Sequence, residues 1–204
     1  MSFYDRHVLP SLIGCACRTR AIMRQRARLI PDARGEVLEI GIGGGANLRF
    51  YDPLRVTSVH GVDPSDALRR QAAAAPRAEG LPLHISEGAA EALPYPDARF
   101  DTVVCTFVLC SVDSPATALR EARRVLKPGG RLLFCEHGLA PDRQVARLQR
   151  RLEPVWSSLA GGCRLTRSVL DELEAAGFEA GPVQQRYLRK APRFVGWMTW
   201  GAAA

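Results

Sequence analysis

Apolar runs rich in β-forming residues alternate with segments of helical spacing along this chain, and this alternation limits the possible folds more than any other feature. The runs cover residues 37–40, 59–62, 83–85, 102–108 and 131–135. Such alternation is typical of parallel strands that are joined by right-handed crossovers and covered by helices on both faces. We therefore predict an α/β fold with a doubly wound, mostly parallel sheet.

Capping residues locate the helices between and after these runs. Ser65 is suited to cap a helix over residues 66–75, because its hydroxyl accepts a hydrogen bond from an N–H group of the first turn. Ser114, which precedes a proline, begins a second helix with apolar residues on one face. A third helix is expected to begin at Thr166 and to end at Gly177.

The length of 204 residues fits one domain with a short appendage. Residues 1–34 are amphipathic and rich in arginine, and we expect them to form an N-terminal helical cap over the active site. Residues 35–204 then form the main domain, with a last strand near residues 195–199. Because no run approaches the ~18 apolar residues that span a bilayer, we expect a cytoplasmic protein with no stable membrane insertion.

The formal net charge of +7 raises the question of a nucleic-acid partner. The basic residues are nearly all arginines, and they are scattered along the chain instead of forming one tract. A nucleic-acid site requires a basic patch or stripe. We therefore expect no nucleic-acid partner.

The six cysteines include no C-x-x-C pair. Several lie in or beside predicted strands, where a free cysteine usually packs as a small apolar side chain. This spacing disfavours both disulfides and structural zinc. We expect free thiols and no metal.

The strongest local signal is a predicted strand that runs into a glycine-rich turn and then a helix, over residues 37–47. Gly41, Gly43 and Gly45 allow a tight turn and a close approach of a nucleotide-like ligand to the backbone. Asp63 follows the second strand, where its carboxylate is suited to accept hydrogen bonds from two ribose hydroxyls. Ligands of open α/β sheets bind at these carboxyl ends of the strands.

Taken alone, this turn also satisfies the loosened dinucleotide fingerprint, so a nicotinamide-dependent oxidoreductase is a rival interpretation. Glu39, two residues before the first glycine, argues against it, because a carboxylate repels a pyrophosphate and suits a cationic ligand. The amino and sulfonium groups of S-adenosylmethionine form such a ligand. Two later segments, at residues 87–95 and 126–132, follow in a fixed order.

This ordered set resembles the class I S-adenosylmethionine-dependent methyltransferases over roughly residues 36–136. The resemblance implies a seven-stranded sheet, S-adenosylmethionine as the cofactor and S-adenosylhomocysteine as its product. It places Gly41, Gly43 and Gly45 at the methionine end of the cofactor, with Glu39 and Asn47 close to them. The other cofactor residues that it implies are Asp63, Pro64, Ser65, Gly88, Ala89, Ala90, Glu91, Thr106 and Leu109.

One position departs from that family. Many members have an aspartate where this chain has Ala89, and that aspartate accepts a hydrogen bond from the adenine amino group. Adenine recognition here would therefore depend on backbone groups or on Glu91.

A closer resemblance, to the methyltransferase-like seven group of thiol S-methyltransferases, runs from about residue 36 to residue 180. Its segments lie at residues 46–51, 103–112, 136–137, 154–156 and 162–167. It implies transfer of a methyl group to the sulfur of a small-molecule thiol by a monomer or homodimer. Unlike membrane-anchored members of the group, this chain shows no hydrophobic N-terminal anchor. An O-, N- or C-methyltransferase of the same fold is the alternative.

His137, directly after the fifth strand, is the candidate catalytic base, because imidazole is suited to accept a thiol proton near neutral pH. The alternative for His137 is a hydrogen bond to a loop or a contact with the cofactor. The N-terminal helices and the segment after the fifth strand are expected to cover the acceptor site. The candidate substrate residues are Tyr4, Cys110, Trp156, Cys163 and Arg167, for several of which packing or solvation is the alternative role.

Overall fold

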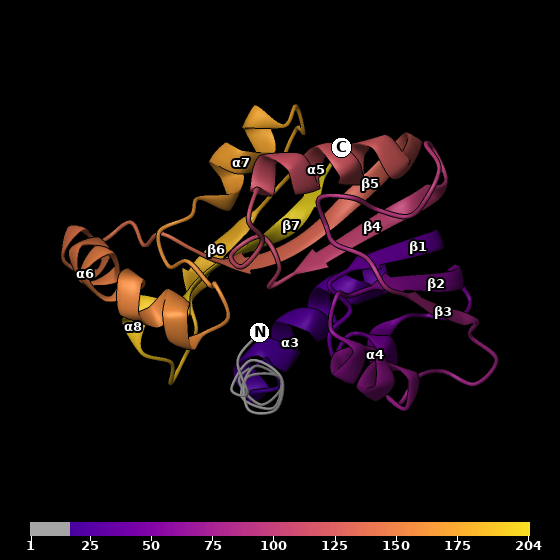
Figure 1. Ribbon diagram of the computed structural model, residues 1–204, viewed down its shortest axis with the longest axis horizontal. Helices are drawn as coiled ribbons and strands as arrows, with labels where there is room; N and C mark the ends of the chain where they lie inside the picture. Colours follow the sequence, from indigo (N-terminus) through magenta and orange to yellow (C-terminus); the bar gives the residue numbers. More distant parts are fainter. Residues whose placement is uncertain (1–16) are drawn as a thin grey trace.

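The computed structural model describes residues 17–204 and contains one seven-stranded sheet with the order β3-β2-β1-β4-β5-β7-β6 (Figure 1). β7 is antiparallel to both of its neighbours, and β1 to β5 are parallel to one another. The predicted doubly wound, mostly parallel sheet of seven strands is therefore confirmed. The strands are β1 (Gly35–Ile40), β2 (Val56–Val62), β3 (Leu83–Ser86), β4 (Phe100–Thr106), β5 (Leu126–His137), β6 (Gln184–Tyr187) and β7 (Trp197–Ala203).

The strand order reverses at β1, which lies between β2 and β4. The chain moves outwards from β1 to β2 and β3, and then returns to the other side of β1 as β4 and β5. A crevice forms at the carboxyl ends of the strands where the order reverses in this way. The fold therefore directs the ends of β1, β2, β4 and β5 towards one ligand-binding edge.

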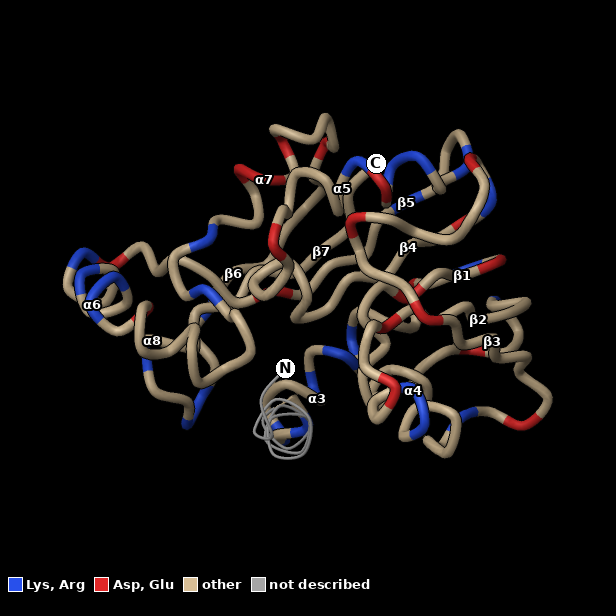
Figure 2. Tube along the Cα trace, in the orientation of Figure 1, with Lys and Arg blue, Asp and Glu red and all other residues tan. Residues whose placement is uncertain are grey.

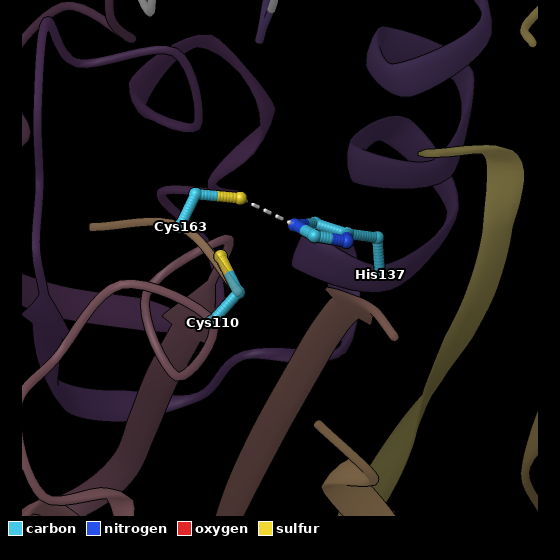
Figure 3. Close-up of side chains that lie close together, drawn as sticks. All are labelled: Cys110, His137 and Cys163. Atoms are coloured by element: carbon cyan, nitrogen blue, oxygen red, sulfur yellow. Dashed lines mark hydrogen bonds between the residues drawn. The ribbon is translucent and has the colours of Figure 1, made fainter. Parts of the chain in front are cut away.

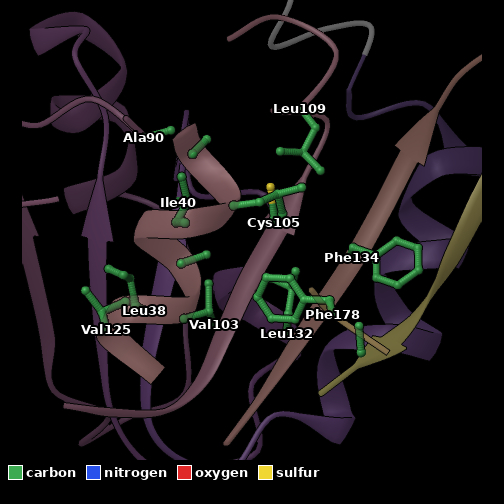
Figure 4. Packing of buried hydrophobic residues seen from close by; sticks show 14 of the residues in the cluster. Leu38, Ile40, Ala90, Val103, Cys105, Leu109, Val125, Leu132, Phe134 and Phe178 are labelled. Carbon is green, nitrogen blue, oxygen red and sulfur yellow. The ribbon is translucent and has the colours of Figure 1, made fainter. Parts of the chain in front are cut away.

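Helices cover both faces of the sheet (Figure 1). Because successive side chains of a strand point to opposite faces, Leu38 and Ile40 pack with α5 and α7, whereas Val37 packs with α3 and α4. Figure 4 shows the first of these two apolar layers. The helices are α3 (Arg20–Leu29), α4 (Asp66–Ala73), α5 (Pro115–Val125), α6 (Arg143–Leu159), α7 (Val169–Ala175) and α8 (Arg193–Gly196), with short 3-10 helices η1 (Ile30–Asp32) and η2 (Leu48–Phe50).

The predicted caps of α4 and α5 are confirmed. The Ser65 hydroxyl accepts a hydrogen bond from Leu68 N at 3.4 Å, and the Ser114 hydroxyl accepts one from Thr117 N at 3.2 Å. Both hydroxyls satisfy N–H groups that have no partner within the helix. α4 and α5 lie on opposite faces of the sheet, since Ala72 of α4 and Ala118 of α5 belong to different apolar layers.

Three details differ from the sequence-based expectations. The glycine-rich turn leads only into η2 and not into a full helix, because Asn47 and Tyr51 turn inwards to bind Glu39. α7 begins at Val169, later than Thr166, because Thr166 instead donates its N–H and hydroxyl to Glu153. The last strand begins at Trp197, since the preceding residues form α8.

Basic residues are spread along the trace instead of forming one patch, although several gather on α6 (Figure 2).

Among the residues that the structure describes, no helix combines the length and the apolar character needed to cross a bilayer.

Candidate active site

The glycine-rich turn follows β1 and lies at the ligand-binding edge. Gly43 has a φ of +53°, and a Cβ built there would meet no atom nearer than the Gly41 carbonyl oxygen at 3.9 Å. Gly45 has a φ of +74°, and a Cβ there would lie 2.7 Å from the Cβ of Ala75. The turn is thus packed against the end of α4 at Gly45, while its backbone at Gly43 faces open space that a ligand can approach.

Asp63, directly after β2, joins this turn to the start of α4. Its Oδ2 accepts a hydrogen bond from Gly43 N at 2.9 Å, and its Oδ1 accepts one from Ser65 N at 2.8 Å. Burial raises the pKa of this carboxyl above its ordinary value, against these two hydrogen bonds and the charge of Arg69. Each carboxylate oxygen has a second lone pair, so Asp63 can hold the turn and still accept a hydrogen bond from a ligand.

Glu39, near the end of β1, belongs to a buried polar network and is only 1% exposed. Its two oxygens accept hydrogen bonds from Asn47 Nδ2 at 2.9 Å and from the Tyr51 hydroxyl at 2.7 Å. Arg26 of α3 donates to Asn47 Oδ1 and to the Thr106 hydroxyl, both at 2.7 Å. This network connects α3, the glycine-rich turn and the end of β4 beneath the ligand-binding edge.

Burial raises the pKa of Glu39 from 4.5 to about 7, although the hydrogen bonds from Tyr51 and Asn47 and the charge of Arg26 lower it. The carboxyl therefore changes charge near neutral pH. Its influence on a cationic ligand is an electrostatic one, since the side chain is buried beneath the turn and does not reach the surface of the ligand-binding edge.

The expected adenine-side residues lie after β2 and β3. Pro64 and Ser65 directly precede α4, of which Ser65 is the N-cap, and Gly88 to Ala90 follow β3, with Ala89 exposed. The Glu91 carboxylate accepts hydrogen bonds from Asp113 N at 3.0 Å and Ser114 N at 3.2 Å. Its negative charge thus stabilises the N-terminus of α5.

The segment after β4 is held firmly in place. Glu136, buried at the end of β5, accepts hydrogen bonds from Val108 N at 2.8 Å and Leu109 N at 3.2 Å. The guanidinium of Arg167 donates to the Leu109 carbonyl from the other side. Phe107 has a φ of +61°, a strained conformation for a bulky residue, and Phe107 N donates to the Cys135 carbonyl at 3.0 Å. Such strain is maintained only where surrounding contacts enforce it.

A cavity of about 760 Å³ lies beside this segment. Its volume is within the usual range for a small-molecule site. α3 forms one wall, and the loop and helix over residues 188–195 form another. Its remaining walls include Phe107, Cys110, His137, Trp156 and Cys163. Among the described residues of the glycine-rich turn, none lines this cavity. The two are connected through β4, because Phe107 in the cavity wall directly follows Thr106, whose hydroxyl accepts a hydrogen bond from Asn47 Nδ2 at 3.0 Å.

Figure 3 shows the thiols of Cys110 and Cys163 beside the imidazole of His137, and all three residues line the cavity. His137 Nε2 lies 3.1 Å from the Sγ of Cys163, to which Trp156 Nε1 donates at 3.2 Å. The Sγ of Cys110 lies within 4.8 Å of both the His137 ring nitrogen and Cys163 Sγ. His137 lies 27 positions after Cys110 and 26 positions before Cys163, so it is the fold that brings these three side chains together.

The pKa values of this group reflect their contacts. Burial lowers the pKa of His137, but the hydrogen bond and charge of Cys163 and the charge of Glu136 outweigh it, and the pKa is raised overall. The pKa of Cys163 is raised by the hydrogen bond with Cys110 and by burial. His137 Nδ1 is buried and has no partner among the described residues.

Of the predicted substrate residues, Cys110, Trp156 and Cys163 line the cavity together with His137. Arg167 is not among the lining residues and instead holds the Leu109 carbonyl from outside. Tyr4 lies outside the described residues.

Arg26 was not among the residues predicted from the sequence, although it is 4% exposed and central to the buried network. Its position could have indicated this role, because it lies at helical spacing from Ile22 and Leu29 on the apolar side of α3. A charged residue on an apolar stripe indicates a buried polar partner.

The comparisons with known proteins agree with this geometry. Residues 38–134 match the family model described as a methyltransferase domain. The chain is 38% identical over 167 residues to thiol S-methyltransferase TMT1B of Rattus norvegicus. This aligned region covers 78% of this chain and 68% of the relative. The chain is 37% identical over 173 residues to the Homo sapiens protein of the same name, covering 80% and 71%.

Solved structures show the same fold. A putative methyltransferase in complex with the Haloferax volcanii Trm112 activator superposes with a TM-score of 0.73 at 16% identity, covering 97% of each chain. A methyltransferase from Thermotoga maritima superposes with a TM-score of 0.66 at 24% identity, covering 98% of each. The fold and site thus define a class I S-adenosylmethionine-dependent methyltransferase. Within that class, the chain belongs to the family of the TMT1 methyltransferases.

Proposed function

We propose that this enzyme transfers the methyl group of S-adenosylmethionine to the sulfur of a small-molecule thiol. The observation that supports this acceptor most directly is the cavity of about 760 Å³ that Phe107 lines after β4, in whose wall His137, Cys110 and Cys163 meet. The curated relatives named thiol S-methyltransferases support the same acceptor.

The cofactor is proposed to bind along the carboxyl ends of β1 and β2. The accessible backbone at Gly43 suits its methionine part, and Asp63 suits its ribose hydroxyls. The segment over residues 88–90 suits the adenine. The acceptor is proposed to bind in the cavity, which Phe107 lines directly after β4.

The charge around the cavity favours an anionic nucleophile. Arg20, Arg24, Arg189 and Lys190 line it, and no acidic residue does so among the described residues. A thiol with a free pKa of ~8.5 is partly ionised at neutral pH, and nearby cations increase the thiolate fraction. The thiolate is the form that attacks carbon.

Methyl transfer from a sulfonium is an in-line displacement: the acceptor sulfur forms a bond to the methyl carbon as the bond to the cofactor sulfur breaks. The protein contributes mainly by holding the reacting atoms in line and excluding water. We propose that His137 accepts the proton that the thiol loses. Cys110, Trp156 and Cys163 are proposed to contact the acceptor.

A mass-spectrometric assay with S-adenosylmethionine and a panel of thiols, alcohols, amines and phenols tests this function. Methylated thiols as the principal products would support it. Transfer to oxygen, nitrogen or carbon alone would keep the enzyme class but reject the thiol acceptor.

A further inference from the structure

We propose that Cys110, His137 and Cys163 form a binding site for a thiophilic divalent cation, of which Zn²⁺ is the reference ion. Nothing in the proposed methyl transfer requires a metal. The proposal does not depend on that function, since metal binding is measured without methyl donor or acceptor.

The ligand atoms are already close to the spacing that zinc imposes. The two Sγ atoms and the imidazole nitrogen all lie within 4.8 Å of one another, and the His137 Nε2 to Cys163 Sγ distance is 3.1 Å. With Zn–S bonds of about 2.3 Å and Zn–N bonds of about 2.0 Å, the ligand atoms of a tetrahedral ion lie about 3.5–3.8 Å apart. Side-chain shifts of less than about 1 Å would therefore complete the coordination.

The three ligands come from separate segments that are each held in place. The Cys110 carbonyl accepts a hydrogen bond from Arg164 N at 2.8 Å, which joins the two cysteine-bearing segments. His137 is the last residue of β5, where it pairs with Met198 of β7. A site whose ligands are held by the fold loses little entropy when a metal binds.

The Trp156 indole N–H, 3.2 Å from Cys163 Sγ, is the kind of outer hydrogen bond that stabilises a coordinated thiolate. Cys110 and Cys163 are both buried, which favours a neutral complex of Zn²⁺ with two thiolates. Coordination exchanges each S–H bond for a Zn–S bond, so up to two protons are released to solvent per ion.

Two thiolates and one imidazole occupy three positions of a tetrahedral ion and leave the fourth free. All three side chains line the cavity, so this fourth position faces it. Three protein ligands with one open position are typical of zinc sites that also bind an exogenous ligand. A cation here would bind the lone pair of His137 Nε2, the ring nitrogen beside Cys163 Sγ, so this nitrogen would no longer accept a thiol proton.

Binding of Co²⁺ to the purified, chelator-treated protein tests the site, because cobalt reports its ligands spectroscopically. We expect one equivalent to bind, with a near-ultraviolet sulfur-to-cobalt band and the visible bands of tetrahedral cobalt, and Zn²⁺ to displace it. Mg²⁺, which prefers oxygen ligands, should not bind. A wild-type protein that shows neither band would overturn the proposal, whatever the variants do.

Variants assign the ligands. Cys110→Ser, Cys163→Ser and His137→Gln should each weaken Zn²⁺ binding at least about tenfold, the scale on which even outer groups of zinc sites act. Cys17→Ser, which changes another cysteine of the same cavity outside the group, is the matched control and should retain binding. Loss of binding in Cys17→Ser but not in Cys110→Ser or Cys163→Ser would contradict the assignment. Circular dichroism checks that each variant is folded.

Discussion

Arg26 of α3 donates a 2.7 Å hydrogen bond to the hydroxyl of Thr106, the last residue of β4 and 80 positions further along the chain. The same Nη1 atom donates to Asn47 Oδ1 in the glycine-rich turn. One buried guanidinium therefore holds a wall of the cavity, the turn and the central strand together.

Arg26→Met should destabilise the protein by about 2–3 kcal/mol, because the Asn47 and Thr106 oxygens would lose a charged donor while remaining buried. Urea unfolding measures this change. Arg28→Met, an exposed arginine of the same helix, is the control and should change the free energy of unfolding by less than about 0.5 kcal/mol. Equal effects of the two substitutions would show that the buried contacts of Arg26 contribute nothing.

Glu39 should make stability depend on pH near neutrality. Its pKa is raised from 4.5 to about 7, so between these values the folded chain retains a proton that the unfolded chain has released. The resulting contribution to the free energy of unfolding is present below about pH 4.5 and is lost as the pH rises through about 7. By the size of the shift, the loss is on the order of 3 kcal/mol.

Glu39→Gln should remove this contribution while keeping amide contacts to Asn47 and Tyr51. Urea unfolding between about pH 5 and about pH 8 should then show a smaller decrease for the variant than for the wild type. Glu174→Gln, at an exposed helix position, should leave the wild-type pH dependence unchanged. A decrease of the same size in Glu39→Gln would mean that Glu39 ionises with its ordinary pKa.

Asp63→Asn should weaken binding of S-adenosylhomocysteine at least about tenfold, as expected for loss of a hydrogen bond to a charged group. An asparagine has one acceptor oxygen, whereas Asp63 accepts from both Gly43 N and Ser65 N. Isothermal titration calorimetry gives the affinity, and thermal unfolding checks stability. Asp66→Asn, three positions further on at an exposed site, should bind normally. Unchanged affinity in Asp63→Asn would show that Asp63 does not bind the cofactor.

His137→Ala, assayed with a chelator present, should lower turnover strongly at about pH 7 and much less at about pH 9, where a thiol of pKa ~8.5 ionises without help. Rates of thiol methylation at the two pH values measure this difference. His84→Ala, outside the cavity lining, should have no such effect. If the variant loses the same factor at both pH values with unchanged cofactor affinity, His137 is not the base.

Much of the fold follows from local patterns. The parallel strands and the capped helices α4 and α5 were predictable because apolar runs, N-cap serines and the proline at position 115 act within one element. The glycine-rich turn was predictable for the same reason. The 17-residue helix α6 and the short strand β6 were not predicted. α6 has a helical pattern, with its four arginines on one face, but it contains Pro154, which usually ends a helix. β6 is mostly exposed and therefore has no apolar run.

The composition of the cavity wall could not be predicted, because it depends on the tertiary structure. The sequence suggested Cys110, His137 and Cys163 as separate candidates, yet no spacing rule indicates that their ligand atoms lie within 4.8 Å of one another. Their proximity results from the strand order and from the return of the chain after α6. The cysteine spacing disfavoured a metal because spacing rules detect only those sites whose ligands are close together in the sequence.

Transfer of the methyl group to sulfur can be tested directly with one acceptor. 2-Mercaptoethanol carries a thiol and a hydroxyl in the same molecule, so both nucleophiles reach the cavity at the same concentration. Incubation with isotopically labelled S-adenosylmethionine, followed by carbon NMR of the product, identifies the atom that bears the methyl group. We predict a labelled S-methyl product; a labelled O-methyl product would contradict the claim.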